Sequence, residues 1–103
     1  MIEVSKAKGS YIYDNDNNRY LDFVAGVSAC SVGHCNKEII NAIRNQSEKY
    51  MHVMVYGEFV TKPSLDLAKL LAKNLPESLN CTYFTNSGTE ALEGSMKLAR
   101  RHT

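Results

Sequence analysis

The sequence lacks tryptophan altogether and contains only two prolines and three cysteines in 103 residues. An odd number of cysteines is a poor basis for a disulfide framework and fits a reducing compartment. The longest strictly apolar run, 53–56, has four residues, whereas a membrane-spanning helix needs about 20. Residues 1–6 do not form the charged and then apolar segment of a secretory signal. The sequence therefore predicts a cytoplasmic protein with no membrane partner.

Charge of one sign is also missing. Twelve Lys and Arg residues stand against eleven Asp and Glu residues, for a net charge of +1. This balance excludes a strongly basic surface of the kind that favours nucleic acids, and we expect no nucleic-acid partner. Hydrophobic residues make up 44% and charged residues 22% of the chain, as in ordinary globular domains. A chain of this length can form one small core.

The start of the chain has the pattern of a β-hairpin. Strand-forming residues at 11–13 and 20–23 flank the polar stretch 14–18, whose Asp and Asn side chains favour turns. A calcium loop is the alternative, but its sixth position requires glycine and is Arg19 here. The small residues of 24–34 follow, bracketed by glycines, and we expect a loop that packs against another surface.

Three helices are predicted after this loop. Asn36 is an N-cap residue for a helix over 37–51, and a second helix over 63–75 begins with a proline, which suits the first helical position. A third helix is predicted over 87–102, and residues 80–85 before it alternate as a short strand does. This strand-helix unit has no second parallel strand after it. The pattern predicts an N-terminal fragment of a longer α/β protein.

Three potential metal ligands, Cys30, His34 and Cys35, lie close together in the sequence. A structural zinc site requires four ligands, usually as two close pairs, and Cys81 has no paired partner nearby. The spacing therefore favours buried structural cysteines and predicts no metal site.

Residues 85–91 join the predicted strand to the last helix. The segment Ser87-Gly88-Thr89-Glu90 matches the capping box, in which serine and glutamate bond each other's exposed amides. The free amides and the positive dipole end of a helix also attract anions, and Gly88 lacks a side chain that would keep a phosphate away. Spacing alone leaves both interpretations open, a phosphate site or a helix cap without a ligand.

Four segments of the sequence are highly specific when taken together in their order and spacing. They are Gly9-Ser10-Tyr11-Ile12-Tyr13-Asp14, then Arg19-Tyr20-Leu21-Asp22-Phe23, then Gly33-His34, and finally Phe84-Thr85-Asn86-Ser87-Gly88-Thr89-Glu90-Ala91-Leu92-Glu93 leading into Lys97-Leu98-Ala99-Arg100. In these segments the chain resembles the N-terminal part of the class III aminotransferases, the group that includes acetylornithine, ornithine and 4-aminobutyrate aminotransferases.

The resemblance implies a piece of a pyridoxal-phosphate-dependent transferase of fold type I. This α/β fold would comprise the β-hairpin, helices and the first strand-helix unit of the large domain. Residues 1–60 would form the N-terminal hairpin, loop and helix segment, and residues 61–103 would begin the large cofactor-binding domain. In the family the matching turn binds the phosphate of pyridoxal 5'-phosphate through backbone amides, here those of Gly88 and Thr89, with Ser87 adjacent. The resemblance also implies a homodimer.

For the reaction, the resemblance implies transfer of an amino group from an amino acid or ω-amino acid to a 2-oxo acid. The family's lysine that holds the cofactor has no counterpart in this chain. Lys97 lies ten residues past Ser87, about 15 Å along a helix that rises 1.5 Å per residue, and cannot reach the reactive end of the cofactor. We therefore expect an inactive fragment that contains no catalytic residue.

Two residues are candidates for the substrate wall. Val27 stands where ornithine aminotransferases place a tyrosine that meets the substrate amine, which argues against ornithine as the substrate. Tyr56 falls near an aromatic residue that lines the substrate entrance in the family, and a core or subunit contact explains it equally well. Two alternatives to an aminotransferase stay open, a glutamate-1-semialdehyde-type aminomutase and a noncatalytic helical interaction module.

Overall fold

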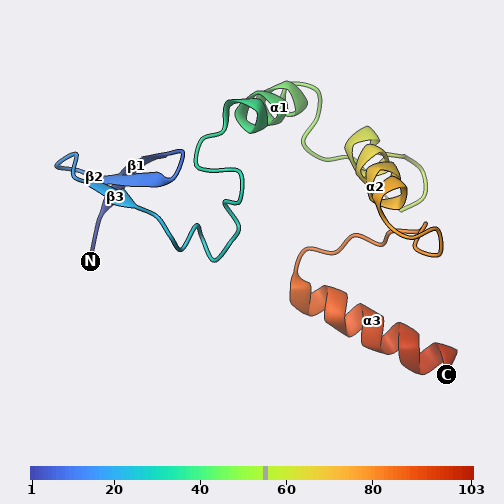
Figure 1. The fold of residues 1–103 in the computed structure, drawn as a ribbon. Helices are drawn as coiled ribbons and strands as arrows, with labels where there is room; N and C mark the ends of the chain where they lie inside the picture. Colours follow the sequence, from blue (N-terminus) through green and yellow to red (C-terminus); the bar gives the residue numbers. More distant parts are fainter. Residues whose placement is uncertain (55) are drawn as a thin grey trace. The chain divides into compact units, whose positions relative to one another are not determined.

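The computed structural model describes residues 1–54 and 56–103, which fall into two compact units, Met1–His52 and Val53–Thr103. The domain division expected after residue 60 stays a prediction. The first unit contains three strands and one helix, and the second contains two helices (Figure 1). In chain order the elements are β1 (Val4–Lys8), β2 (Tyr11–Asp14), β3 (Arg19–Leu21), α1 (Lys37–Ser47), α2 (Lys62–Asn74) and α3 (Gly88–His102).

The strands form one antiparallel sheet in the order β1-β2-β3. The hairpin of β2 and β3 is confirmed, with Tyr11 opposite Leu21 and Ile12 opposite Tyr20. Strand β1 was not expected, because its sequence VSKAK holds a single strong strand former. Pairing with β2 makes it a strand, and its register shifts between Val4 and Lys6.

The turn between β2 and β3 is organised by the side chain of Asp14. Its Oδ1 accepts the amide N–H of Asp16 at 3.0 Å and that of Asn18 at 2.9 Å, and its Oδ2 accepts the Tyr20 hydroxyl at 2.9 Å. A side-chain hydrogen bond from Asn18, and a weaker one from Tyr20, lower the pKa of Asp14. The predicted hairpin turn is therefore confirmed, and the carboxylate serves the turn itself.

Helix α1 begins where the sequence predicts and ends earlier. The Asn36 side chain accepts the amides of Glu38 and Ile39, which confirms the N-cap. The helix stops at Ser47 rather than at residue 51, because the last turn tightens and the Gln46 side chain donates to the Tyr50 carbonyl at 3.0 Å. Helix α2 begins at Lys62, one residue before the predicted start, and its proline lies in the first turn.

Residues 80–85, all of which the structure describes, form no strand, and this prediction is wrong at the level of secondary structure. A strand exists only through backbone hydrogen bonds to a neighbouring strand. No described residue offers this segment such a partner. The segment therefore has the composition of a strand but no neighbouring strand to pair with among the described residues.

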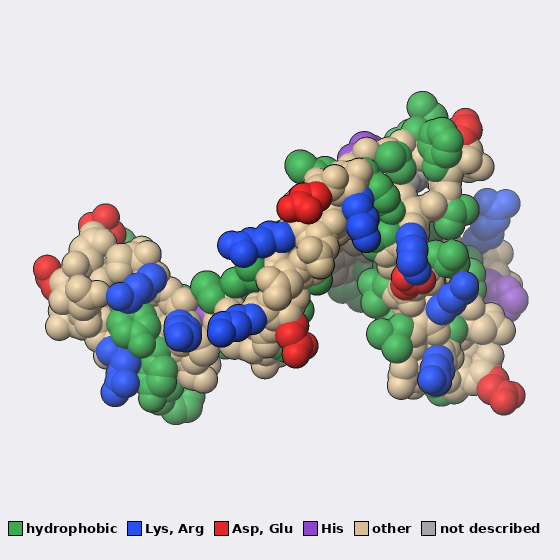
Figure 2. All heavy atoms as spheres, turned by 90° about the horizontal axis from the view of Figure 1, so that it is seen from above, with side chains coloured by type: hydrophobic (Ala, Val, Ile, Leu, Met, Phe, Trp, Pro, Cys, Tyr) green, Lys and Arg blue, Asp and Glu red, His purple; other side chains and the backbone are tan. Residues whose placement is uncertain are grey.

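None of the described residues is buried, so each helix exposes apolar side chains. In α3 the exposed fractions are 65% for Leu92 and 70% for Leu98. Figure 2 shows hydrophobic side chains between Lys and Arg side chains on the visible surface. The prediction of buried cysteines is wrong for this structure, since Cys35 and Cys81 are exposed. Among the described residues, no helix is long and apolar enough to cross a membrane.

Candidate functional site

The first turn of α3 is capped by its own side chains. Ser87 is the N-cap residue, and its Oγ accepts the amide N–H of Glu90 at 3.2 Å. The Glu90 carboxylate reaches back and accepts the amide N–H of Asn86 at 2.8 Å. The predicted capping interaction is confirmed with one difference, because a regular capping box would direct the glutamate to the N–H of Ser87.

Three amides at this turn are left available. Within residues 1–54 and 56–103, the N–H groups of Ser87, Gly88 and Thr89 have no hydrogen-bond acceptor. A Cβ added to Gly88 would meet no atom within 4 Å, and the φ of Gly88 is not positive. The glycine is therefore not required by the backbone, and it leaves open space next to free donors at the positive end of the helix dipole. The turn fits a phosphate group.

Within α3, no lysine lies close to the turn at Gly88. Glu90 lies in the first turn of the helix, and the basic residues of the last turn lie at the opposite end. Lys97 pairs with Glu93 at 3.4 Å on the exposed surface. It is nine residues beyond Gly88, about 14 Å along the helix axis. The turn can therefore bind an anion through backbone amides, without a lysine from α3.

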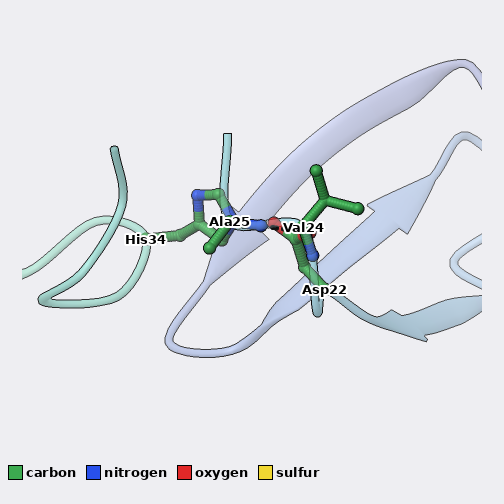
Figure 3. Close-up of polar contacts among 4 residues, drawn as sticks. All are labelled: Asp22, Val24, Ala25 and His34. Atoms are coloured by element: carbon green, nitrogen blue, oxygen red, sulfur yellow. Dashed lines mark hydrogen bonds and ion pairs between the residues drawn. The ribbon is translucent and has the colours of Figure 1, made fainter. Parts of the chain in front are cut away.

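A second cluster, not anticipated from the sequence, closes the loop between β3 and α1. His34 Nε2 lies 2.7 Å from Asp22 Oδ2, with 19% and 13% of the two side chains exposed. Asp22 Oδ1 accepts the amides of Val24 at 3.1 Å and Ala25 at 2.9 Å (Figure 3). The hydrogen bond from His34, together with those from Ala25 and Val24, lowers the pKa of Asp22. The ionised carboxylate can only accept, so His34 donates in this pair.

Backbone contacts hold both ends of this loop against the β1–β2 turn. Gly9 and His34 exchange two hydrogen bonds, of 2.9 and 2.8 Å, and the Asp22 amide donates to the Ser10 carbonyl at 2.9 Å. Gly33 has φ +81°, and a Cβ there would lie 3.3 Å from the Gly9 carbonyl oxygen. Both the positive φ and the close approach require glycine at this position.

Between these ends the backbone makes one left-handed turn. Residues 25–28 have φ values of 48, 59, 56 and 69°, and the Ser28 amide donates to the Val24 carbonyl at 3.1 Å. Non-glycine residues in this conformation cost roughly 1–2 kcal/mol each. Val27 is β-branched, which makes its positive φ unusual, and its side chain is 86% exposed. Such strain persists only where surrounding contacts enforce it.

The five predicted site residues fall in both units of the chain. Ser87, Gly88 and Thr89 are contiguous at the start of α3, in the second unit, where Tyr56 also lies. Tyr56 is 88% exposed, so it is not packed in a core of the described chain. Val27 belongs to the first unit. The cofactor-binding and substrate-binding roles of these residues stay predictions.

Sequence reasoning missed Asp22 and His34 as a pair, because they stand twelve positions apart. One local signal was present, since an Asp after a strand commonly accepts the amides two and three residues on. That signal points to Val24 and Ala25 as partners. Nothing local identifies His34 as the group that completes the cluster.

Comparisons with known proteins agree on the family. The family model described as aminotransferase class III matches residues 1–103. The chain is 41% identical over 101 residues to acetylornithine aminotransferase from Clostridium acetobutylicum, covering 98% of this chain and 25% of that protein. The chain therefore belongs to the class III aminotransferase family. It spans about a quarter of the length of the curated relatives it matches.

Solved structures that match this chain are also aminotransferases. Adenosylmethionine-8-amino-7-oxononanoate aminotransferase from Methanocaldococcus jannaschii matches with a TM-score of 0.90 and 35% identity, over 97% of this chain and 23% of that one. N-acetylornithine aminotransferase from Stenotrophomonas maltophilia matches with a TM-score of 0.83 and 27% identity, over 97% of this chain and 27% of that one. The chain thus matches the N-terminal piece of the α/β fold of fold type I transaminases, as the resemblance implied.

Proposed function

We propose that this chain supplies the phosphate-binding turn and part of the substrate wall of a pyridoxal-phosphate-dependent aminotransferase. The enzyme transfers an amino group from an amino acid or ω-amino acid to a 2-oxo acid. The observation that carries the proposal is the pair of free amides at Gly88 and Thr89, beside a glycine with open space above it. Pyridoxal phosphate, when bound, supplies an electron sink for bond breaking at the amino-bearing carbon of the substrate.

Each residue of the site has a separate task in this proposal. The amides of Gly88 and Thr89, at the positive end of the α3 dipole, bind the cofactor phosphate and fix its position. Ser87 occupies the N–H of Glu90 and so holds the first turn in shape. Val27 and Tyr56 present exposed apolar surface to the substrate. No residue of this chain is assigned a catalytic role.

The partners of the reaction follow from the same proposal. The curated relative from Clostridium acetobutylicum is named for acetylornithine, and Nα-acetylornithine is therefore the first amino donor to test. The acceptor is a 2-oxo acid. We place the enzyme in the cytoplasm as a homodimer.

The proposal is tested in a chimera that carries residues 1–103 of this chain in place of the matching quarter of the Clostridium acetobutylicum enzyme. Gly88→Val adds a side chain where no protein atom lies within 4 Å, and Gly94→Val makes the same change in the middle of α3, also in open space. Gly88→Val should weaken cofactor affinity about tenfold to a hundredfold, as for a lost hydrogen bond to a charged group. Gly94→Val should leave it unchanged.

Three results would redirect the interpretation. Equal cofactor affinity in Gly88→Val and the unmodified chimera would mean that the turn is only a helix cap, in line with a noncatalytic module. Equal losses in Gly88→Val and Gly94→Val would mean that the effect acts through α3 as a whole. In the full-length enzyme that contains this chain, an amino group that moves within one molecule, with no 2-oxo acid consumed, would identify an aminomutase.

A further inference from the structure

The turn that carries Val27 is unfavourable in two independent ways. Its backbone is left-handed at residues 25–28, including the β-branched Val27 itself. The apolar side chain of Val27 is 86% exposed, so no burial among the described residues offsets the strain. A strained backbone that displays an apolar side chain outward is typical of a position that serves a ligand.

The Asp22 carboxylate is the group that holds this turn in place. One of its oxygens accepts the two amides that enter the left-handed turn, those of Val24 and Ala25. The other oxygen, Oδ2, accepts from His34 at the far end of the loop. With both oxygens engaged the carboxylate cannot rotate, and its geometry fixes the direction in which the chain enters the turn.

His34 is itself fixed by its backbone. Its amide and carbonyl both bond Gly9, which joins it to the β1–β2 turn of the sheet. Because the backbone of His34 is bonded to the sheet, the imidazole holds the Asp22 carboxylate at a fixed place, and the carboxylate in turn holds residues 24–28. The chain of contacts runs from Gly9 through His34 and Asp22 to Val27, and every link is a hydrogen bond or a covalent segment of a few residues.

We propose that Asp22 and His34 form a positioning pair that sets the location of Val27 and thereby selects the amino donor. This inference rests on the proposed function, in which Val27 belongs to the substrate wall. The pair does not touch the reacting atoms. It acts by holding the wall at a fixed distance from the donor side chain, so that loosening the pair weakens donor binding before it affects turnover.

The first measurement is independent of activity. In the chimera with the full chain of residues 1–103, hydrogen exchange is followed in the peptide that covers residues 23–34. His34→Ala should raise exchange at the amides of Val24 and Ala25 about tenfold, since His34 no longer holds their acceptor, the Asp22 carboxylate, in place. His34→Gln keeps an N–H donor and should restore most of the protection. His52→Ala, an exposed histidine outside the loop, is the matched control.

The second measurement separates positioning from general stability. His34→Ala should raise KM for Nα-acetylornithine about tenfold while kcat changes little, because the ground-state wall has moved. Asp22→Asn, which cannot accept on its amide nitrogen, should behave in the same way, and His34→Gln should recover KM.

Two results overturn the positioning pair while leaving the proposed function intact. One is unchanged exchange at residues 24 and 25 in an active His34→Ala chimera. The other is a loss of kcat and thermal stability with KM unchanged. A full-length enzyme containing this chain that binds cofactor but transfers no amino group refutes the proposed function, and the donor-selecting role of the pair with it.

Discussion

The Ser87 hydroxyl oxygen accepts the Glu90 amide N–H at 3.2 Å, while the Glu90 carboxylate accepts the N–H of Asn86 rather than that of Ser87. This displaced capping box leaves the three amides between Asn86 and Glu90, those of Ser87, Gly88 and Thr89, without acceptors among the described residues. A cap that satisfies the amides on either side and leaves the three between them free is suited to an anion with several oxygens.

Ser87→Ala should destabilise the first turn of α3 by about 1 kcal/mol, because the Glu90 amide loses its acceptor. The measurement is the helical 13Cα chemical shift of residues 88–92 by NMR. Ser87→Asp is the matched control and should preserve these shifts, since aspartate is an equally good N-cap residue. Identical shifts in Ser87→Ala and the unmodified chain would contradict a role for the hydroxyl.

Val27→Gly should stabilise the loop, whereas the same change at Val32 should destabilise it. Val27 has φ 56°, and glycine removes roughly 1–2 kcal/mol of strain at a cost of about 0.5–1 kcal/mol in chain entropy. Val32 is also exposed but is not among the positive-φ residues, so Val32→Gly relieves no strain and only adds the entropy cost of glycine. Denaturant unfolding of the two chimera variants measures the difference, and a lower stability for Val27→Gly than for Val32→Gly would contradict the strain.

The hydrogen bonds that the Asp22 carboxylate accepts from Val24, Ala25 and His34 should weaken in acid. The folded-state pKa of Asp22 is lowered below its ordinary value of 3.8, chiefly by the His34 hydrogen bond. Its stabilising effect is therefore complete above pH 3.8 and is lost as the pH falls through the lowered folded value. The amide proton shifts of Val24 and Ala25 should move together in that range, and Asp22→Asn should abolish the titration. A midpoint above pH 3.8 would show that the carboxylate is not held as described.

No lysine of this chain should become specifically bound to pyridoxal phosphate. Lys97 is already paired with Glu93 and lies about 14 Å along α3 from Gly88. Treatment of the 103-residue chain with stoichiometric cofactor and borohydride, followed by peptide mapping, should give low and scattered labelling. A single lysine labelled to completion would refute this expectation, and the chimera serves as the positive control.

The 103-residue chain should associate with itself in solution. None of the described residues is buried, and α3 alone exposes Leu92, Met96 and Leu98 by more than half of their surfaces. Covering such surfaces releases roughly 25 cal/mol per Å² of apolar area, so a dimer or a higher oligomer is expected. Sedimentation equilibrium over a wide concentration range measures this. A monodisperse monomer with a cooperative thermal transition would contradict it.

Much of the local structure was predictable because its interactions span three or four residues. The Asn36 cap, the proline at the start of α2 and the Ser87–Glu90 contact were all expected and are confirmed. The end of α1 was not, because the competing bond from Gln46 to the Tyr50 carbonyl leaves no periodic pattern in the sequence.

The sequence by itself determined the family, the hairpin turn at Asp14 and the capped turn at Ser87, because motif order and side-chain-to-backbone bonds between near neighbours carry them. Only the tertiary structure decided that Val4–Lys8 is a strand and that residues 80–85 are not. It also decided that Asp22 meets His34. A strand depends on a partner's backbone, and a side-chain pair twelve residues apart depends on how the intervening chain turns. Neither the partner strand nor the course of the intervening chain can be predicted from the local sequence.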